Sequence, residues 1–403
     1  MSGPRRTWSF AAMLASLSML GPFAVDAYLP AFPAIAEDLG ASSLAVQQTL
    51  STFLFAFAAM MLWHGALADA FGRRAVVLAG LGLFAVGTLG CAIAGNIESL
   101  WLFRVLQGMS AGIGVVVGRA IIRDAFQGPE AQRLMSQTTL VFGIAPALAP
   151  VLGGALLNIA GWRSIFWALL VLVLGVLVWA ARHLPETLPV ASRQPLRPRV
   201  LWRNYRTVSS RIDFLLLAFI PALSFSGFFL YIASAPAFLI GLLGVTTWGF
   251  AWLFVPMIAG IMLGATLSGR LAGRLSPQRT IRLGYAIMFA GIVVNMAVCV
   301  LLSPRVPWSV LPLLIYATGS SLVMPSVTLL LLDVFPEMRG LASSLQGFVN
   351  FALAGLTAGT IAPLLARSTV TLALGITGYA LASFALWLAY QRRARLELKS
   401  WAA

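Results

Sequence analysis

Asp26 and Arg104 lie deep inside long apolar stretches of this chain, where a charge is costly and usually serves a function. Asp26 lies about 18 residues into the first stretch and Arg104 about six residues into the fourth, so a rise of 1.5 Å per residue places both in the outer half of a bilayer. Burial opposes ionisation of a carboxyl and a nearby cation favours it. Asp26 is therefore expected to exchange a proton in competition with a cationic or dipolar compound. The similar depth of the two residues allows Asp26 to contact Arg104. A static ion pair is the alternative.

Other reactive side chains are too scattered to form a second kind of site. Cys91 and Cys299 lie in apolar stretches without a partner at metal-ligand spacing, and His64 and His183 lie at the predicted ends of helices. The chain has no Gly-x4-Gly-Lys-Ser/Thr loop for ATP phosphates. We therefore expect no metal, no cofactor and no enzymatic activity.

The composition indicates a protein embedded in a membrane. Hydrophobic residues make up 60% of the 403 residues and charged residues 10%, against about 25% charged in soluble domains. The apolar stretches are too long and continuous for barrel strands, and each fits the roughly 20 residues that a spanning helix needs. The sequence predicts an all-α membrane protein of about twelve spans: 8–28, 44–66, 75–95, 98–121, 134–158, 162–182, 212–234, 247–269, 280–302, 307–332, 341–365 and 370–391.

The arginines and lysines predict the orientation. With a cytoplasmic N-terminus, 22 of the 27 basic residues fall in inside segments and three fall outside, which satisfies the positive-inside rule. Both termini are therefore expected in the cytoplasm. Because topology accounts for the net charge of +15, we expect no nucleic-acid partner.

The spans group into two related halves. We expect a six-helix bundle over 1–182, a cytoplasmic linker loop rich in Pro and Arg over 183–211, and a second six-helix bundle over 212–403. Two short repeats, 204 and 209 residues apart, support a pseudo-symmetric duplication: Gly65-Ala-Leu-Ala with Gly269-Arg-Leu-Ala, and Asp124-Ala-Phe with Asp333-Val-Phe.

The loop between the second and third spans carries a compact motif, Gly65-Ala-Leu-Ala-Asp69-Ala-Phe-Gly72-Arg73-Arg74. Gly65 permits close helix packing, and Gly72 can adopt a turn conformation. Asp69 can accept hydrogen bonds at the N-terminus of a neighbouring helix. The motif resembles the signature of the major facilitator superfamily, and the resemblance implies a major facilitator fold in which this loop is a cytoplasmic latch between the halves. A tight positive-inside turn is the alternative.

Three further segments narrow the resemblance: Asp26-Ala-Tyr28-Leu-Pro-Ala-Phe-Pro-Ala-Ile, Arg104-Val-Leu-Gln107-Gly, and Gly143-Ile-Ala-Pro146-Ala-Leu-Ala-Pro150-Val-Leu-Gly153-Gly154 followed by Gly161-Trp-Arg-Ser-Ile-Phe-Trp. Together they resemble the bicyclomycin/chloramphenicol resistance (Bcr/CflA) branch of the drug:proton antiporters. The resemblance implies functional positions at Asp26 and Arg104, and Tyr28 and Gln107 are further candidates for proton coupling or substrate binding.

The fifth span is predicted to bend and to pack closely. Pro146 and Pro150 each remove a backbone hydrogen bond, and Gly153 and Gly154 allow another helix to approach. By resemblance this motif marks antiporters rather than symporters. Ordinary kinked packing is the alternative.

The second half has no charge deep in a span, and its candidate drug pocket is uncharged. Gln346 and Asn350 are four residues apart and share a helix face. Lipid-facing or packing roles are the alternative for the aromatic side chains. The predicted pocket residues are Phe228, Tyr231, Trp252, Gln346 and Asn350.

These features predict a secondary active exporter that exchanges protons for small amphipathic, drug-like compounds and so confers antibiotic resistance. We expect a multi-pass monomer in the lipid bilayer of a bacterial inner membrane. An uptake symporter or a metabolite exporter on the same fold is the nearest alternative. A membrane sensor and a membrane enzyme are disfavoured, because the chain shows neither a soluble signalling domain nor a catalytic cluster.

Overall fold

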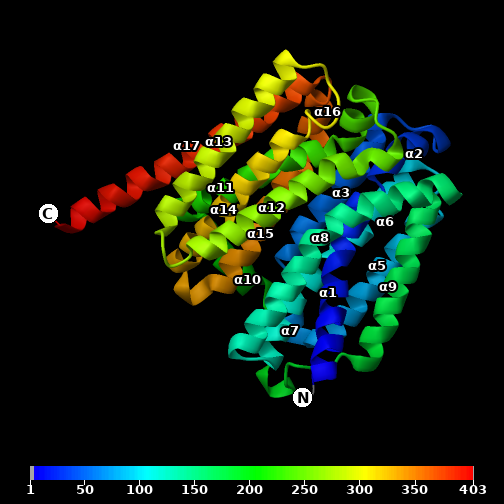
Figure 1. The fold of residues 1–403 in the computed structure, drawn as a ribbon. Helices are drawn as coiled ribbons and strands as arrows, with labels where there is room; N and C mark the ends of the chain where they lie inside the picture. Colours follow the sequence, from blue (N-terminus) through cyan, green and yellow to red (C-terminus); the bar gives the residue numbers. More distant parts are fainter. Residues whose placement is uncertain (1–3, 403) are drawn as a thin grey trace. The chain divides into compact units, whose positions relative to one another are not determined.

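The computed structural model describes the backbone of residues 4–402 and the side chains of 10–396 except 129, 132, 136 and 139–142. Every regular element within this range is a helix (Figure 1). Arg5, Arg6 and Lys399, which contribute to the predicted charge asymmetry, have side chains outside the described set. Within the described chain, 12 helical segments are long and apolar enough to cross a membrane. The predicted all-α membrane architecture is confirmed.

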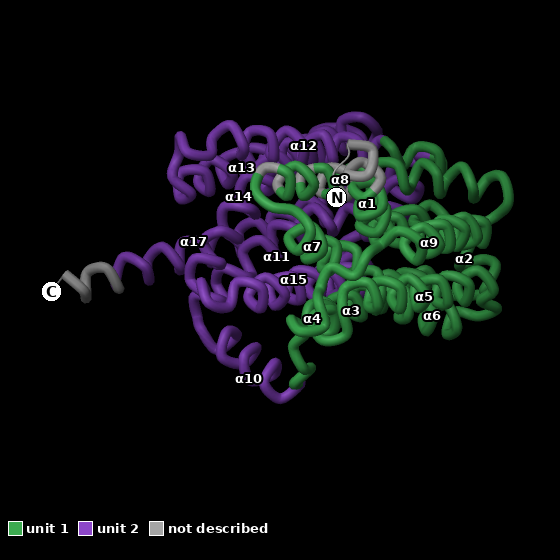
Figure 2. The backbone as a smooth tube through the Cα atoms, turned by 90° about the horizontal axis from the view of Figure 1, so that it is seen from below, with its two compact units in different colours: residues 1–197, 246–251 green, residues 198–245, 252–403 purple. Residues whose placement is uncertain are grey.

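The chain forms two compact units, which Figure 2 distinguishes by colour: residues 1–197 with 246–251, and residues 198–245 with 252–403. The division at Arg197 falls inside the segment predicted to link the two halves. The α-helices of unit 1 are α1 (Pro4–Asp26), α2 (Phe32–Asp38), α3 (Ser43–Met61), α4 (His64–Phe71), α5 (Arg73–Ala92), α6 (Ile97–Ala111), α7 (Ile113–Ala125), α8 (Gly128–Ala160) and α9 (Arg163–His183).

Unit 2 contains the remaining α-helices, apart from Ala251, the first residue of α12. They are α10 (Pro198–Ser209), α11 (Ile212–Ala233), α12 (Ala251–Leu271), α13 (Pro277–Leu301), α14 (Leu311–Val334), α15 (Arg339–Leu356), α16 (Ala362–Leu365) and α17 (Thr369–Ala402). Short 3-10 or π segments join or extend these helices in both units: Leu29–Ala31, Val190–Ser192, Pro236–Leu242, Thr247–Phe250, Pro336–Met338 and Thr357–Ile361.

Most helix ends lie within a few residues of the predicted span ends, with informative exceptions. The first span continues beyond α1 through Leu29–Ala31 and α2 to Asp38. Prolines at the starts of both added segments suit the first turn of a helix, where no N–H partner is needed. The second span ends at Met61, and α4 follows as a separate helix.

The predicted linker loop 183–211 is not wholly a loop, because it contains the helix α10. Tyr205 and Val208 are buried on one side of α10, which packs against α11 and α15. This apolar side stabilises a helix that the Pro and Arg content of the segment did not indicate.

Local capping explains where several spans begin. The side chains of Ser42, Asn96 and Ser276 accept hydrogen bonds from backbone N–H groups three residues later, at 3.1, 2.8 and 3.4 Å. Gly161, with φ of 76°, ends α8 in a conformation that other residues rarely adopt.

The outward surfaces of the spans are apolar. Val171 in α9 is 72% exposed and Val293 in α13 is 67% exposed. Exposed apolar side chains at mid-span are costly in water and are accommodated by lipid. The surface therefore agrees with the twelve spans in requiring a bilayer.

Candidate functional site

A buried polar network surrounds Arg104 in unit 1. Arg104 is fully buried on α6, and its Nη1 donates to the carbonyl oxygen of Ala24 at 2.9 Å and to Oε1 of Gln107 at 2.8 Å. The guanidinium carbon lies 4.3 Å from the ring centroid of Tyr28 and 4.4 Å from that of Phe53. Two aromatic faces and two acceptors partly offset the cost of burying this charge. Nε and Nη2 have no hydrogen-bond partner among the described groups.

Neighbouring side chains fix the orientation of the Gln107 amide. Its Nε2 donates to Oγ1 of Thr88 at 2.8 Å, so its oxygen faces Arg104. The hydroxyl of Tyr28 hydrogen-bonds Oγ1 of Thr49 at 3.0 Å. Four helices, α1, α3, α5 and α6, thus meet at one polar network. It brings together Tyr28, Arg104 and Gln107, three of the four residues predicted for proton coupling or substrate binding.

Asp26, the fourth candidate, ends α1 two residues after Ala24 and is 4% exposed. The ion pairs among the described side chains do not include one between Asp26 and Arg104. The contact that depth alone allowed is therefore not formed in this conformation. Arg104 instead reaches α1 through the carbonyl oxygen of Ala24.

The fourth span is broken at Gly112, between α6 and α7. Nε2 of His64, a fully buried residue on α4, lies 3.0 Å from the carbonyl oxygen of Met109, one turn before the start of α7. Because a carbonyl only accepts, Nε2 carries the proton. A Cβ on Gly112 would lie 3.1 Å from two atoms of the His64 ring. His64 therefore holds the backbone at the break, a role that its position at a helix end did not reveal.

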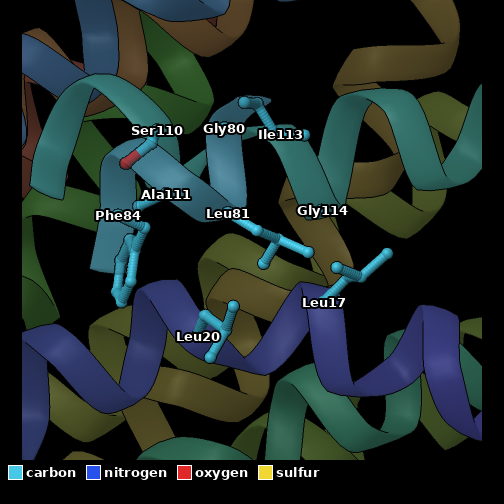
Figure 3. A pocket seen from close by; sticks show the side chains of 9 residues that line it. All are labelled: Leu17, Leu20, Gly80, Leu81, Phe84, Ser110, Ala111, Ile113 and Gly114. Atoms are coloured by element: carbon cyan, nitrogen blue, oxygen red, sulfur yellow. The ribbon is translucent and has the colours of Figure 1, made fainter. Parts of the chain in front are cut away.

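A small cavity lies next to the break, with Ala111 and Ile113 in its wall (Figure 3). Its volume of about 10 Å³ is that of roughly one water molecule. Its walls are mainly apolar, and drug-sized ligands need several hundred Å³, so the cavity is not a drug site. Its walls are Leu17, Leu20, Gly80, Leu81, Phe84, Ser110, Ala111, Ile113 and Gly114.

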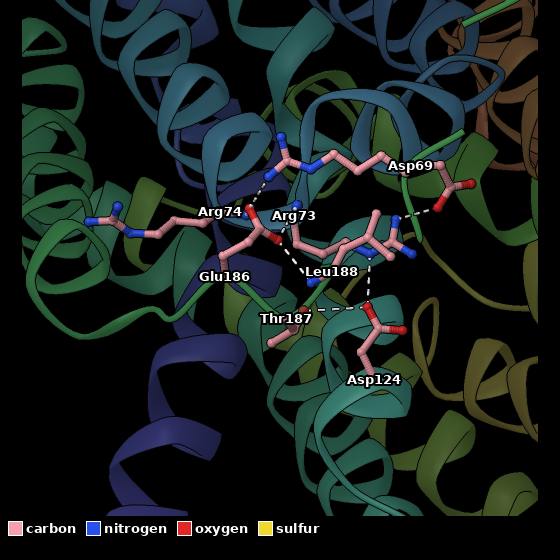
Figure 4. Close-up of polar contacts among 8 residues, drawn as sticks. Asp69, Arg73, Arg74, Asp124, Glu186, Thr187 and Leu188 are labelled. Carbon is pink, nitrogen blue, oxygen red and sulfur yellow. Dashed lines mark hydrogen bonds and ion pairs between the residues drawn. The ribbon is translucent and has the colours of Figure 1, made fainter. Parts of the chain in front are cut away.

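The motif between the second and third spans forms a charged cluster (Figure 4). Arg73 is its centre: Nη1 donates to Oδ1 of Asp69 at 2.6 Å and Nε donates to Oδ2 of Asp124 at 3.0 Å. Arg74 Nη2 donates to the carbonyl oxygen of Ala181 at 2.7 Å. The two arginines thus connect the α4–α5 turn to α7 and α9.

Glu186, which was not among the predicted residues, caps the start of α5. Its Oε1 accepts from the backbone N–H of Arg73 at 2.9 Å and of Leu188 at 3.0 Å, and its Oε2 accepts from that of Arg74 at 3.3 Å. Arg193 lies 3.7 Å from the same carboxylate. A signal was present in the sequence, because Glu186 is the single acidic residue of 183–211.

The expectations for Gly65 and Asp69 need correction. Gly65 is not a close-packing site, because a Cβ there would meet nothing within 4 Å. Asp69 accepts from the Arg73 side chain, and the helix N-terminus is capped by Glu186 instead. Gly72 has φ of 95°, and a Cβ there would lie 2.8 Å from Nη2 of Arg193, so this position requires glycine.

The fifth span is a single long helix, α8, with Pro146 and Pro150 inside it. A Cβ on Gly153 would collide with the backbone of Ala27 in the first span. A Cβ on Gly154 would lie 2.7 Å from the carbonyl oxygen of Thr247, which belongs to the same unit. Both glycines thus lie at close backbone approaches.

The five candidate pocket residues of unit 2 have separate surroundings. Asn295 Nδ2 donates to the hydroxyl of the buried Tyr231 at 2.9 Å, and Gln346 Nε2 donates to Oγ1 of Thr328 at 3.0 Å. Trp252 is 47% exposed.

Phe228 is buried and packs edge to face on Phe225, 4.8 Å between ring centroids. The Oδ1 atom of Asn350 is buried without a partner among the described groups. These contacts do not define one shared pocket.

The sequence is similar to a family model and to several bacterial proteins. Residues 14–359 match the family model described as Major Facilitator Superfamily. The chain is 30% identical over 369 residues to a bicyclomycin resistance protein homolog of Haemophilus influenzae, covering 90% of this chain and 91% of that protein. It is 29% identical over 335 residues to the multidrug resistance protein MdtL of Escherichia coli, covering 83% of each.

Solved structures share the fold at low identity. A bacterial homolog of the human lysosomal transporter Spinster matches with a TM-score of 0.76 and 17% identity, over 97% of this chain and 98% of that one. A D-xylose-proton symporter matches with a TM-score of 0.72 and 14% identity, over 94% and 97%. These likenesses concern the fold alone.

Proposed function

The chain belongs to the Major Facilitator Superfamily of secondary transporters, and we propose that it exports small amphipathic, drug-like compounds in exchange for protons. The names of the relatives in Haemophilus influenzae and Escherichia coli, which refer to bicyclomycin and multidrug resistance, support drug export. Both relatives are bacterial, and we place this multi-pass protein in a bacterial inner membrane with both termini in the cytoplasm.

The burial of Asp26 is the observation that carries the proposal. The Asp26 carboxyl is 4% exposed inside a membrane span and has no ion pair among the described side chains. This burial strongly disfavours its charged form. Such a group takes up a proton readily and releases it when a cation or the dipole of a compound approaches. Proton and substrate then displace each other, which is the coupling that antiport requires.

Arg104, Tyr28 and Gln107 have a supporting role in this proposal. The Arg104 charge is held by neutral partners, so it remains available to interact with Asp26 or with substrate when the helices move. Its Nε and Nη2 atoms, unpartnered among the described groups, supply the donors for such an interaction. Movement of α1 relative to α6 would therefore change the electrostatic environment of the carboxyl.

The charged cluster and α8 supply the conformational part of the cycle. We assign the latch role to Asp69, Arg73, Arg74 and Asp124, whose contacts join helix ends of unit 1 on the proposed cytoplasmic side. The prolines of α8 allow bending, and Gly153 keeps α8 close to the residue after Asp26. Alternating access would use both features. Domain limits at 1–182, 183–211 and 212–403 remain part of this proposal.

Everted membrane vesicles test the mechanism. After energisation, a transported drug should release protons through the wild type and should release none through Asp26→Asn. Asp333→Asn is the matched control, because Asp333 is 72% exposed at the end of α14 and should keep normal coupling. Equal coupling in Asp26→Asn and wild type would refute the role of Asp26. Proton-driven drug uptake into intact cells would instead support the symporter.

A further inference from the structure

The segment that joins the two units carries an unbalanced positive charge. Between Glu186 and Asp213 there is no acidic residue. Six arginines lie in this interval: Arg193, Arg197, Arg199, Arg203, Arg206 and Arg211. Three of them fall within the twelve residues of α10.

The arginines of α10 share one side of the helix. At 100° per residue, Arg199, Arg203 and Arg206 fall within about 60° of one another, and all three are exposed. None of the three forms an ion pair with a described carboxylate. Trp202 flanks this arginine face and is 71% exposed.

The opposite side of α10 is attached to the membrane-spanning helices. Tyr205 and Val208 are buried, and α10 packs on α11 and α15. The hydroxyl of Tyr205 hydrogen-bonds the side chain of Ser344, five residues into α15. At 1.5 Å per residue this contact lies about 7.5 Å along that helix.

The short connection between α10 and α11 also limits how far α10 can lie from the start of a span. The helix α10 ends at Ser209, and the span of α11 begins at Ile212. Two intervening residues reach at most about 10 Å. The helix therefore lies at the level where spans enter the membrane, where lipid headgroups are the nearest anionic groups.

We propose that the arginine face of α10 binds the phosphate groups of anionic phospholipids, with Trp202 at the headgroup boundary. Arginine forms bidentate hydrogen bonds with phosphate. Tryptophan prefers the interface between water and hydrocarbon. A basic helix of this kind binds anionic lipid more tightly with each added charge, and each arginine raises the affinity about fivefold at moderate salt.

Native mass spectrometry of the full-length detergent-solubilised chain measures this binding directly. The protein is titrated with phosphatidylglycerol and, separately, with phosphatidylcholine. We expect a preference for phosphatidylglycerol that falls by about a hundredfold when Arg199→Gln, Arg203→Gln and Arg206→Gln are combined. The corresponding lysine replacements keep the charge and should retain most of the preference.

A second triple variant is the matched control. Arg270, Arg274 and Arg279 are also exposed arginines of unit 2, near the ends of α12 and α13. Changing all three to glutamine removes the same charge and should leave phosphatidylglycerol binding within about twofold of wild type. Equal losses in both triple variants would show general charge attraction and overturn the assignment to α10, as would no loss in either.

Competition identifies the source of the phosphate. Inorganic phosphate or a short RNA, at concentrations matched in phosphate to the lipid, should leave the lipid adducts in place. Displacement by RNA would overturn the proposal in favour of nucleic-acid binding, and displacement by inorganic phosphate would overturn it in favour of a soluble anion. Because only exposed side chains are changed, all variants should melt as wild type. If the glutamine variant does not fold, Trp202→Ala with the three arginines intact should still weaken the preference.

Discussion

The approach of α8 to α1 at Gly153 gives a sharp test of how tightly these helices must pack. A Cβ on Gly153 would lie 2.6 Å from the carbonyl carbon of Ala27, whereas ordinary contacts begin at 3.4 Å. Gly153→Ala must therefore separate the two backbones by at least about 0.8 Å, the difference between these distances. No side-chain rotation can relieve the collision, because the atoms of Ala27 involved are backbone atoms. Overpacking of this kind costs about 1–3 kcal/mol.

The displacement falls next to the proposed coupling site. Ala27 lies between Asp26 and Tyr28, whose ring covers the guanidinium of Arg104. If the cost falls on one conformation of the cycle, its population changes by roughly 5- to 150-fold. We expect drug-induced proton release in everted vesicles, normalised to the amount of protein, to fall by a factor in that range. The melting temperature in detergent should fall as well.

Gly143→Ala on the same helix is the control. A Cβ on Gly143 would meet nothing within 4 Å, and alanine favours a helix interior over glycine by about 1 kcal/mol. This variant should transport normally and melt at the same or a higher temperature. Wild-type transport and melting in Gly153→Ala would refute the argument that this close approach is needed.

Three further variants test individual contacts. Glu186→Ala removes the cap of α5 and should lower the free energy of unfolding by about 0.5–2 kcal/mol, measured as a lower melting temperature at neutral pH. Burial lowers the pKa of His64 to about 4 from 6.5. As the pH is lowered, the unfolded chain therefore binds a proton at His64 before the folded chain does, and the free energy of unfolding of the wild type should fall by up to about 3 kcal/mol between about pH 6.5 and 4. His64→Gln should lack that fall in melting curves recorded across this pH range. Gln107→Leu removes one acceptor from a buried N–H of Arg104 and should lower the free energy of unfolding by about 1–3 kcal/mol. An unchanged melting temperature would contradict this.

The number of spans and their approximate ends were predictable from the sequence. An apolar stretch and the turn or charged residues that end it are neighbours along the chain. The contact between Arg104 and Gln107 is also local, because residues three apart share one face of a helix. The partners of Arg73 were not predictable in this way. Asp124 and Glu186 lie 51 and 113 residues from it in sequence, and only tertiary packing brings them together.

Gly65 illustrates the opposite error. Glycine at a helix end is compatible with close packing, but its neighbours depend on how α4 is oriented against the bundle. In the structure that side of α4 is open. Gly153 has the same residue type and the reverse outcome, so glycine alone could not distinguish the two positions.

The polar groups buried in unit 2 differ in kind from those in unit 1. Ser383 hydrogen-bonds Ser224 at 2.9 Å and Tyr285 at 2.7 Å, and Tyr316 donates to the carbonyl oxygen of Ser224 at 3.0 Å. The described buried polar side chains of unit 2 are all uncharged.

Hydroxyl and amide groups do not change charge near neutral pH, so this network can hold helices in register but cannot itself store a transported proton. If export is coupled to protons as proposed, we expect the coupling charge to come from unit 1, where Asp26 is buried. Removal of a hydroxyl, as in Tyr285→Phe, should then change stability or turnover while leaving the number of protons released per drug unchanged. A changed ratio in that variant would contradict the assignment of coupling to Asp26.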